Sequence, residues 1–275
     1  MTGDLHCHTR FSDGSVSAEE LVRLAKKTGL DYVAVTDHDC VLPKSEAQAL
    51  YEKYGAHVIH GAELSCIDPS TGRKVHMLCL LPEKTDRLDT HCREIQAARD
   101  AAGIKMAQKV SKLFPVTLEE ITEYKRESKS IFKQHIMRAL AERGFTLDFY
   151  GELYKELFNE KSGSCYEYVD YPDVDFILGL IHESEGTAIL AHPKVYKSME
   201  LAKALAKSGK IQGVEVYHHS ADEEARSTLS ALCKENGLIM TGGSDFHGMY
   251  SASPRTLGSN KTDEENLLRI IKKEA

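Results

Sequence analysis

The sequence predicts an α/β fold, a distorted (β/α)7 barrel interrupted by an all-α insertion. Seven short segments with strand patterns are mostly separated by helical segments, which indicates a mostly parallel sheet. His, Asp or Glu lies on nearly every predicted strand or just past its C-terminal end. In an α/β barrel those ends meet at one mouth, so we expect these polar side chains to converge there.

The first predicted strand, residues 3–8, contains a pair of histidines. Side chains alternate along a strand, so His6 and His8 point to the same face, and Asp13 follows on the next loop. Two imidazoles beside a carboxylate make half of a metal site.

The segment up to Pro82 supplies further polar residues at strand ends. Ser17 and Glu20 form a capping box before a helix, and the turn at 68–72 predicts a hairpin. We expect helices at 18–27 and 44–54 and strands at 32–36, 57–60 and 75–81. The polar residues on or after these strands are Asp37, His38, Glu63 and His76.

Residues 86–179 show only helical patterns, with helices expected at 86–113, from Thr117, at 132–143 and at 147–158, and a loop at 163–172. The segment from Arg99 to Arg143 contains ten Lys or Arg residues but only six Asp or Glu residues. This excess is either a solvated helical face or the rim of a site for an anionic substrate. We expect residues 1–85 and 180–275 to form the barrel and residues 86–179 to form a cap that contributes to substrate binding.

The alternation of helices and strands resumes after the insertion. Helices are expected at 174–185, 198–207, 222–236 and from Thr262, and strands at 187–191, 213–217 and 238–241. These strands lead into His192, into His218 and His219, and into Asp245 and His247.

Composition restricts the class of protein. The net charge of −7 argues against a general nucleic-acid coat. No apolar run approaches the roughly 18–20 residues that span a membrane, and the first strand leaves no room for a signal peptide. The seven cysteines are an odd number without a C-x-x-C pair, which is typical of reduced thiols. We expect a cytoplasmic protein that binds neither duplex DNA nor a membrane.

The candidate ligands are imidazoles and carboxylates, which suit Mn²⁺, Fe²⁺ or Zn²⁺. One ion needs only three or four protein ligands, so the set is large enough for two or three ions. Such ions bind phosphate oxygens and activate water as hydroxide for attack on phosphorus. The candidates are His6, His8, Asp13, His38, Glu63, His76, His192, Asp245 and His247.

These motifs, in this order, resemble the PHP (polymerase and histidinol phosphatase) superfamily. The resemblance rests on His6-x-His8 with Phe11-Ser12-Asp13-Gly14, Val35-Thr36-Asp37-His38, Gly61-Ala62-Glu63, Val75-His76-Met77-Leu78, Ala191-His192-Pro193 and Gly243-Ser244-Asp245-Phe246-His247. The insertion is similar to that of stand-alone bacterial PHP phosphoesterases, although Lys133-Gln134-His135 stands where these usually have Arg-Pro-His.

The resemblance implies a trinuclear centre. His6, His8, Glu63 and Asp245 would hold the first ion. Glu63 would bridge to a second ion, held also by His76 and His192. Asp13, His38 and His247 would hold the third.

Several further residues have roles that the sequence leaves open. Asp37 is expected to orient a histidine ligand. Glu215 either does the same or packs within a barrel layer. His218 or His219 would act as a general acid or touch the leaving group. Residues expected to grip a phosphate or nucleotide are Arg99, Lys133 and His135.

The resemblance implies a metal-dependent phosphoesterase acting on a small nucleotide. The expected substrates are AMP, a 3′,5′-bisphosphonucleotide or the 5′ end of a short single-stranded oligonucleotide. Two alternatives remain: a histidinol-phosphate phosphatase, and a non-catalytic module that binds metal or nucleotide.

Overall fold

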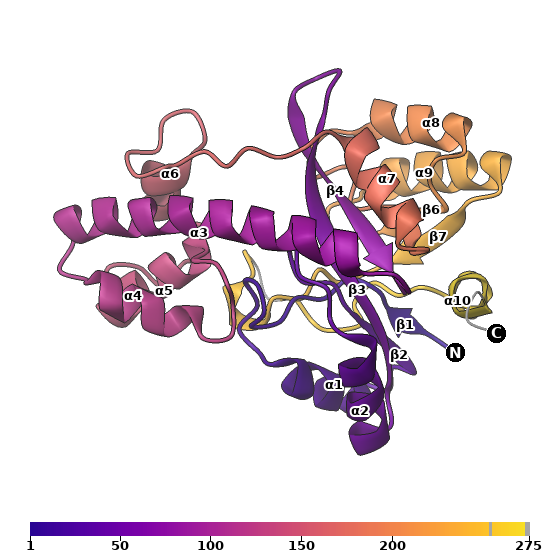
Figure 1. Cartoon of the computed structure of the whole chain (residues 1–275), viewed down its shortest axis with the longest axis horizontal. Coiled ribbons are helices and arrows are strands. Elements are labelled where there is room, and N and C mark those ends of the chain that lie inside the picture. Colours follow the sequence, from indigo (N-terminus) through magenta and orange to yellow (C-terminus); the bar gives the residue numbers. More distant parts are fainter. Residues whose placement is uncertain (253–254, 273–275) are drawn as a thin grey trace.

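The computed structural model describes residues 1–252 and 255–272, and its strands form one sheet that curls into a nearly closed barrel (Figure 1). The edge strands approach each other where the Leu5 N–H donates to the Gly242 carbonyl over 3.1 Å. The strands lie side by side in chain order: β1 (Gly3–Asp4), β2 (Tyr32–Val35), β3 (His57–Asp68), β4 (Arg73–Leu80), β5 (Thr187–Leu190), β6 (Gly213–Tyr217) and β7 (Ile239–Gly242). The predicted seven-stranded α/β barrel is confirmed.

The sheet departs from a parallel barrel at β4, which pairs antiparallel with both β3 and β5. The turn before it is held by Asp68, whose carboxylate accepts from the hydroxyls of Ser70 and Thr71. This is the hairpin that the turn sequence predicts. Strand β3 is longer than the predicted strand at 57–60 because its pairing with β4 continues from Gly61 to Asp68.

Helices cover the outside of the barrel. Helix α1 (Ala18–Lys27) begins after the N-cap residue Ser17, and Glu20 completes the capping box as predicted. The apolar faces pack onto the strands, and Ile177 and Ile181 of α7 (Val174–Glu183) share one core cluster with residues of β3, β4 and β5. None of the helices in residues 1–252 and 255–272 is both long and apolar enough to cross a membrane. The barrel helices are α1 (Ala18–Lys27), α2 (Lys44–Tyr54), α7 (Val174–Glu183), α8 (Met199–Ser208), α9 (Glu223–Asn236) and α10 (Glu264–Ile271).

A second group of helices projects from the barrel (Figure 1). Helix α3 (Asp86–Leu113) runs from the barrel outward, and α4 (Leu118–Lys125), α5 (Lys133–Glu142) and α6 (Glu152–Phe158) lie beside its far half. These helices share their own apolar core. The close packing needs Gly103, because a Cβ there would lie 2.3 Å from the Ile131 carbonyl oxygen.

Helix α6 is shorter than the predicted helix at 147–158. Thr146 donates from its hydroxyl to the Asp148 carbonyl, and the Asp148 carboxylate accepts from the Tyr150 N–H. Such local side-chain bonds compete with helical hydrogen bonds, so the helix begins only after Gly151.

Candidate metal centre

Glu63 lies at the centre of the polar residues in the barrel mouth. Strand β3 pairs with β2 as far as His60 and with β4 from Gly61 onward, and Glu63 lies just after this change of partner. Its Oε1 atom lies 2.7 Å from both His76 Nδ1 and His192 Nε2. Its Oε2 atom lies 3.3 Å from His6 Nε2, 3.2 Å from His8 Nε2 and 3.0 Å from His38 Nδ1. One buried carboxylate thus contacts histidines from both halves of the chain.

His6 and His8 point to the same side, as their spacing predicts, with ring centroids 5.2 Å apart. The regular strand β1 ends at Asp4, but its direction continues because Cys7 forms a parallel bridge with Phe246. Both Nε2 atoms also face Asp245 Oδ1, at 3.7 Å for His6 and 3.4 Å for His8.

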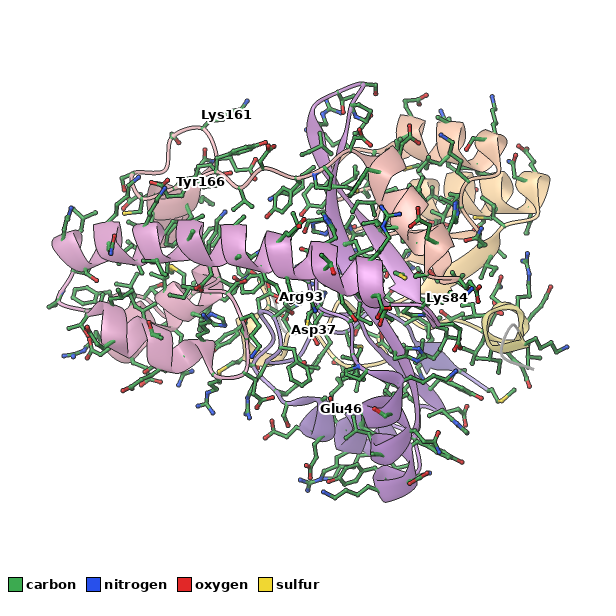
Figure 2. The ribbon with its side chains drawn as sticks, viewed as in Figure 1. Asp37, Glu46, Lys84, Arg93, Lys161 and Tyr166 are labelled. Atoms are coloured by element: carbon green, nitrogen blue, oxygen red, sulfur yellow. The ribbon has the colours of Figure 1, made fainter. Side chains whose placement is uncertain are left out.

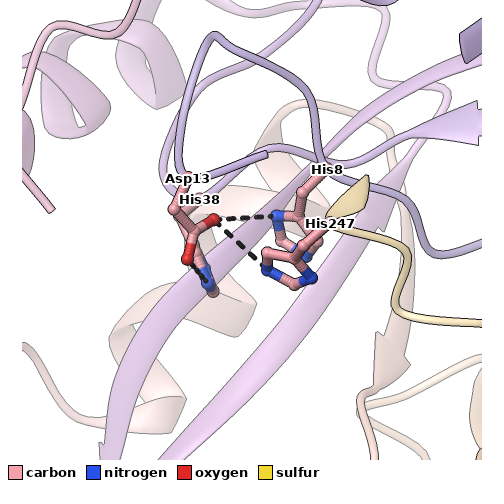
Figure 3. Close-up of side chains that lie close together, drawn as sticks. All are labelled: His8, Asp13, His38 and His247. Carbon is pink, nitrogen blue, oxygen red and sulfur yellow. Dashed lines mark ion pairs between the residues drawn. The ribbon is translucent and has the colours of Figure 1, made fainter. Parts of the chain in front are cut away.

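Asp13 organises a second part of the centre (Figure 3). Its carboxylate lies 3.3 Å from His247 Nε2, 3.7 Å from His8 Nδ1 and 3.9 Å from His38 Nε2. The loop that carries Asp13 is fixed by buried Asp37, which accepts from Thr9 N–H at 2.8 Å and the Ser12 hydroxyl at 2.5 Å. Asp37 therefore holds this loop. Within the described chain its carboxylate has no hydrogen bond to a histidine, so it does not orient a ligand ring directly.

Strained backbone accompanies two of these residues. His192 has φ +24° and Asp245 has φ +52°, both in the region that residues with a Cβ rarely adopt. Next to them Gly243 is required, because a Cβ there would lie 2.2 Å from the Cβ of His6. Strain of this kind is characteristic of functional sites.

Buried nitrogen atoms without hydrogen-bond partners give independent evidence that these side chains suit divalent cations. Buried polar atoms are nearly always hydrogen-bonded, yet within the described chain His6 Nε2, His8 Nε2 and His38 Nδ1 have no hydrogen-bond partner. Each lies within ion-pair distance of Glu63 Oε2 but is misaligned for a direct bond. A cation bound jointly by these nitrogens and oxygens would satisfy both.

Protonation states agree in part with that fit. Burial alone would raise the pKa of Glu63, but His76 and His6 hold it well below the usual value. Burial lowers the pKa of His38 to about 3, so its imidazole is neutral. Ionised carboxylates and neutral imidazoles are the forms that bind metal. Burial alone would lower the pKa of His8, but hydrogen bonding to Asp245 and Glu63 raises it to about 10, so an ion bound there must displace a proton.

A cavity of 360 Å³ opens over this centre between barrel and cap. Arg99 and Lys133 from the cap line it, as do Glu63 and Asp13 from the barrel. Its aromatic walls are Phe132, Tyr150, Tyr154, Tyr166, Tyr171, Tyr196 and Tyr250.

The other predicted site residues do not line this cavity. His135 is buried and lines a separate pocket. His218 is buried, with Nε2 3.4 Å from Asp245 Oδ2, whereas His219 is exposed. Together with Asp245 these two histidines form a further group whose ligand atoms lie within 4.8 Å of one another.

Two contacts were not anticipated. Gln134 donates from Nε2 to Asp13 Oδ2 over 3.0 Å and to the Tyr150 hydroxyl over 2.8 Å. The only signal in the sequence was its place between Lys133 and His135. Tyr196 lies with its hydroxyl 3.4 Å from His76 Nε2, and no pattern in the sequence singled it out.

Fold and site together define a class of protein: a distorted α/β barrel whose mouth carries a histidine–carboxylate centre suited to several metal ions. The model of the PHP domain family matches residues 4–188, and the chain belongs to this family. It is a metal-dependent phosphoesterase.

Relatives and solved structures agree with this assignment. The chain is 33% identical over 258 residues to phosphoribosyl 1,2-cyclic phosphate 1,2-diphosphodiesterase of Eggerthella lenta, covering 92% of this chain and 97% of that protein. It is 29% identical over 266 residues to 3′,5′-nucleoside bisphosphate phosphatase of Chromobacterium violaceum, covering 89% and 86%. A crystal structure of a candidate metal-dependent phosphoesterase from Bifidobacterium adolescentis superposes with a TM-score of 0.88 and 29% identity, covering 98% and 95%.

Proposed function

We propose that the centre holds two or three Mn²⁺, Fe²⁺ or Zn²⁺ ions. In this proposal His6, His8, Glu63 and Asp245 hold the first ion; Glu63, His76 and His192 hold the second; and Asp13, His38 and His247 hold the third. The position of Glu63 supports this division, because its two oxygens face different sets of histidines. Bound ions would polarise phosphate oxygens and lower the pKa of water.

We infer that the substrate is a small phosphorylated ribose compound, most simply a nucleotide. The observation that carries this inference is the cavity over the centre, whose volume of 360 Å³ suits a small molecule. Cationic and aromatic side chains line it together, which favours a ligand with both a phosphate and a flat or apolar part.

Arg99 is the residue best placed to bind a second phosphate of the substrate. Its guanidinium lies 5.0 Å from the Phe132 ring centroid and 5.8 Å from that of Tyr171. Asp39 accepts a hydrogen bond from its Nη2. Its Nη1 is buried and has no hydrogen-bond partner among the described residues, so it remains available to an anion.

Lys133 is another of the cations at the cavity wall, which Lys74 and Arg255 also line. It lies over the Tyr166 ring, with Nζ 4.8 Å from the centroid. Both curated relatives have names that describe a ribose compound with two phosphate groups. Several cations at the cavity wall support a substrate of that kind.

Two reactions are compatible with this arrangement. The first is hydrolysis of a phosphomonoester or of the 5′-end phosphodiester of AMP, a 3′,5′-bisphosphonucleotide or a short single-stranded oligonucleotide. The second is hydrolysis of a cyclic phosphate on a phosphoribosyl group, favoured by the identity of 33% along nearly the whole Eggerthella lenta enzyme.

In this proposal the cap determines substrate specificity, and the barrel carries the residues that perform the reaction. In the division that we propose, residues 1–85 and 180–275 form the barrel and residues 86–179 the cap. Helix α7 begins at Val174 and packs onto β3, β4 and β5, so we refine the proposal by assigning α7 to the barrel.

The experiment compares turnover of AMP, a 3′,5′-bisphosphoadenosine, a 5′-phosphorylated trinucleotide, phosphoribosyl 1,2-cyclic phosphate and histidinol phosphate by the Mn²⁺-loaded protein. Preference for any of the first four over histidinol phosphate supports the proposal, and the preferred compound selects between the two reactions. Preference for histidinol phosphate would overturn the substrate class. Absence of turnover with all five would leave a binding module.

A further inference from the structure

A second pocket of 230 Å³ lies between the cap and the barrel mouth. Arg10 and Ser15 come from the loop that carries Asp13, and Tyr250 follows His247 along the chain. Arg126 and Arg138 come from the end of α4 and from α5. Tyr250 lines both this pocket and the cavity over the metal centre, so the two are neighbours.

The charge of this pocket is one-sided. Its described walls carry the cations Arg10, Lys125, Arg126 and Arg138 and no carboxylate. The ion-pair partners of three of them, Glu20, Asp100 and Glu142, are not part of the walls. Arg126 is exposed and has no ion pair within the described chain. Three of the cations are thus paired with carboxylates outside the walls, while the charge of Arg126 stays uncompensated and favours an anion in the pocket.

His135 adds a directed donor. It is 1% exposed, and its Nδ1 accepts a hydrogen bond from the Phe132 N–H over 3.1 Å. A neutral imidazole that accepts at Nδ1 carries its proton on Nε2. Burial lowers the pKa of His135 to about 4, so the ring is neutral. Its Nε2–H has no partner among the described residues and is free to donate to a ligand in the pocket that His135 lines.

We propose that this second pocket is a binding site for a phosphate group, separate from the phosphate that is hydrolysed. Arginine side chains and an N–H donor are the groups that recognise phosphate oxygens. Two sources share this chemistry: free inorganic phosphate, and the next phosphate along an oligonucleotide whose 5′ end occupies the metal centre. The second source rests on the proposed function, whereas the first does not.

The test measures inorganic phosphate binding to the Mn²⁺-loaded protein by calorimetry. The variants are Arg126→Gln and the double variant Arg126→Gln/Arg138→Gln. Lys161→Gln is the matched control, because it removes an exposed cap cation that lies at the periphery of the molecule (Figure 2). The wild type and the control should bind one phosphate more per chain than the double variant. Arg126→Gln alone should weaken that phosphate about tenfold.

Equal stoichiometry and affinity in the wild type and the double variant would overturn the proposal. If the double variant does not fold, Arg126→Gln decides alone, because the exposed Arg126 has no ion pair to lose within the described chain. The KM values then identify the source. A rise of about tenfold for the trinucleotide with AMP unchanged supports the substrate phosphate, and unchanged KM values beside a lost phosphate support the free anion. Absence of turnover would sink the proposed function while leaving the binding measurement valid.

Discussion

The Oε1 atom of Glu215 lies 3.0 Å from Nδ1 of His6, with both side chains buried in the barrel. This contact leaves the other ring nitrogen of His6 facing Glu63 and Asp245. Glu215 also accepts from the His192 N–H over 2.8 Å and so connects two proposed ligands of different ions. A carboxylate behind a histidine fixes the orientation of the ring and raises its basicity.

Glu215→Gln should therefore weaken metal binding about 10- to 100-fold. Gln keeps the shape of the side chain but removes its charge. The variant should therefore be impaired only in metal affinity, and a high Mn²⁺ concentration should restore its activity. A Mn²⁺ titration monitored by both bound metal and phosphate release checks this, with Glu235→Gln on the exposed face of α9 as the control. Unchanged Mn²⁺ affinity in Glu215→Gln would reduce Glu215 to a packing residue.

Glu63→Ala should abolish metal loading and activity together, because Glu63 contacts histidines assigned to all three ions. Metal content per chain and phosphate release are the two readouts. Glu63→Gln preserves the volume and guards against collapse of the site, while Glu152→Gln, at an exposed position of α6, serves as control. A Glu63→Ala protein that keeps its full complement of metal would contradict the bridging role.

Lys133 makes substrate binding depend on pH. Burial lowers the pKa of its ammonium to about 8, with Lys74 adding to the effect. The charged form is present below that pKa and is lost as the pH rises through it, so KM should increase above about pH 8. Lys133→Arg should flatten this increase, since a guanidinium stays protonated. The check is KM from pH 6.5 to 9.5, and identical profiles in the two proteins would exclude Lys133 as the titrating group.

Arg99→Lys should raise KM about tenfold for substrates with two phosphates and leave metal content unchanged. Lysine keeps the charge but cannot stack flat between Phe132 and Tyr171 while binding Asp39. Steady-state kinetics on AMP and on the bisphosphonucleotide separate the effects, with AMP affected less. A fall in kcat on both substrates at unchanged KM would instead assign Arg99 to the chemistry.

The sequence predicted the barrel and the convergence of its polar residues because both follow from local patterns. Strand–helix alternation indicates which strand ends share the mouth, where Glu63 and Asp245, far apart in the sequence, both face Nε2 of His6. The hairpin at Asp68 was likewise predicted by its turn residues.

Contacts made across elements could not be predicted in the same way. The approach of Gln134 to Asp13 depends on how α5 is placed against the barrel loop, which no periodicity encodes. The role of Glu215 was open because a buried strand residue has the same pattern whether it packs or holds a histidine. The separate pocket at His135 depends on the packing of α4 and α5 against the loop after β1.

The most direct test of the account is phosphate release by the wild-type protein before and after removal of metal. We predict that chelation abolishes turnover of AMP and of the bisphosphonucleotide, and that Mn²⁺ restores it with at least two ions bound per chain. Turnover that persists in the chelated protein would contradict the account, as would failure of the Mn²⁺-loaded protein to release phosphate from any of the compounds proposed above.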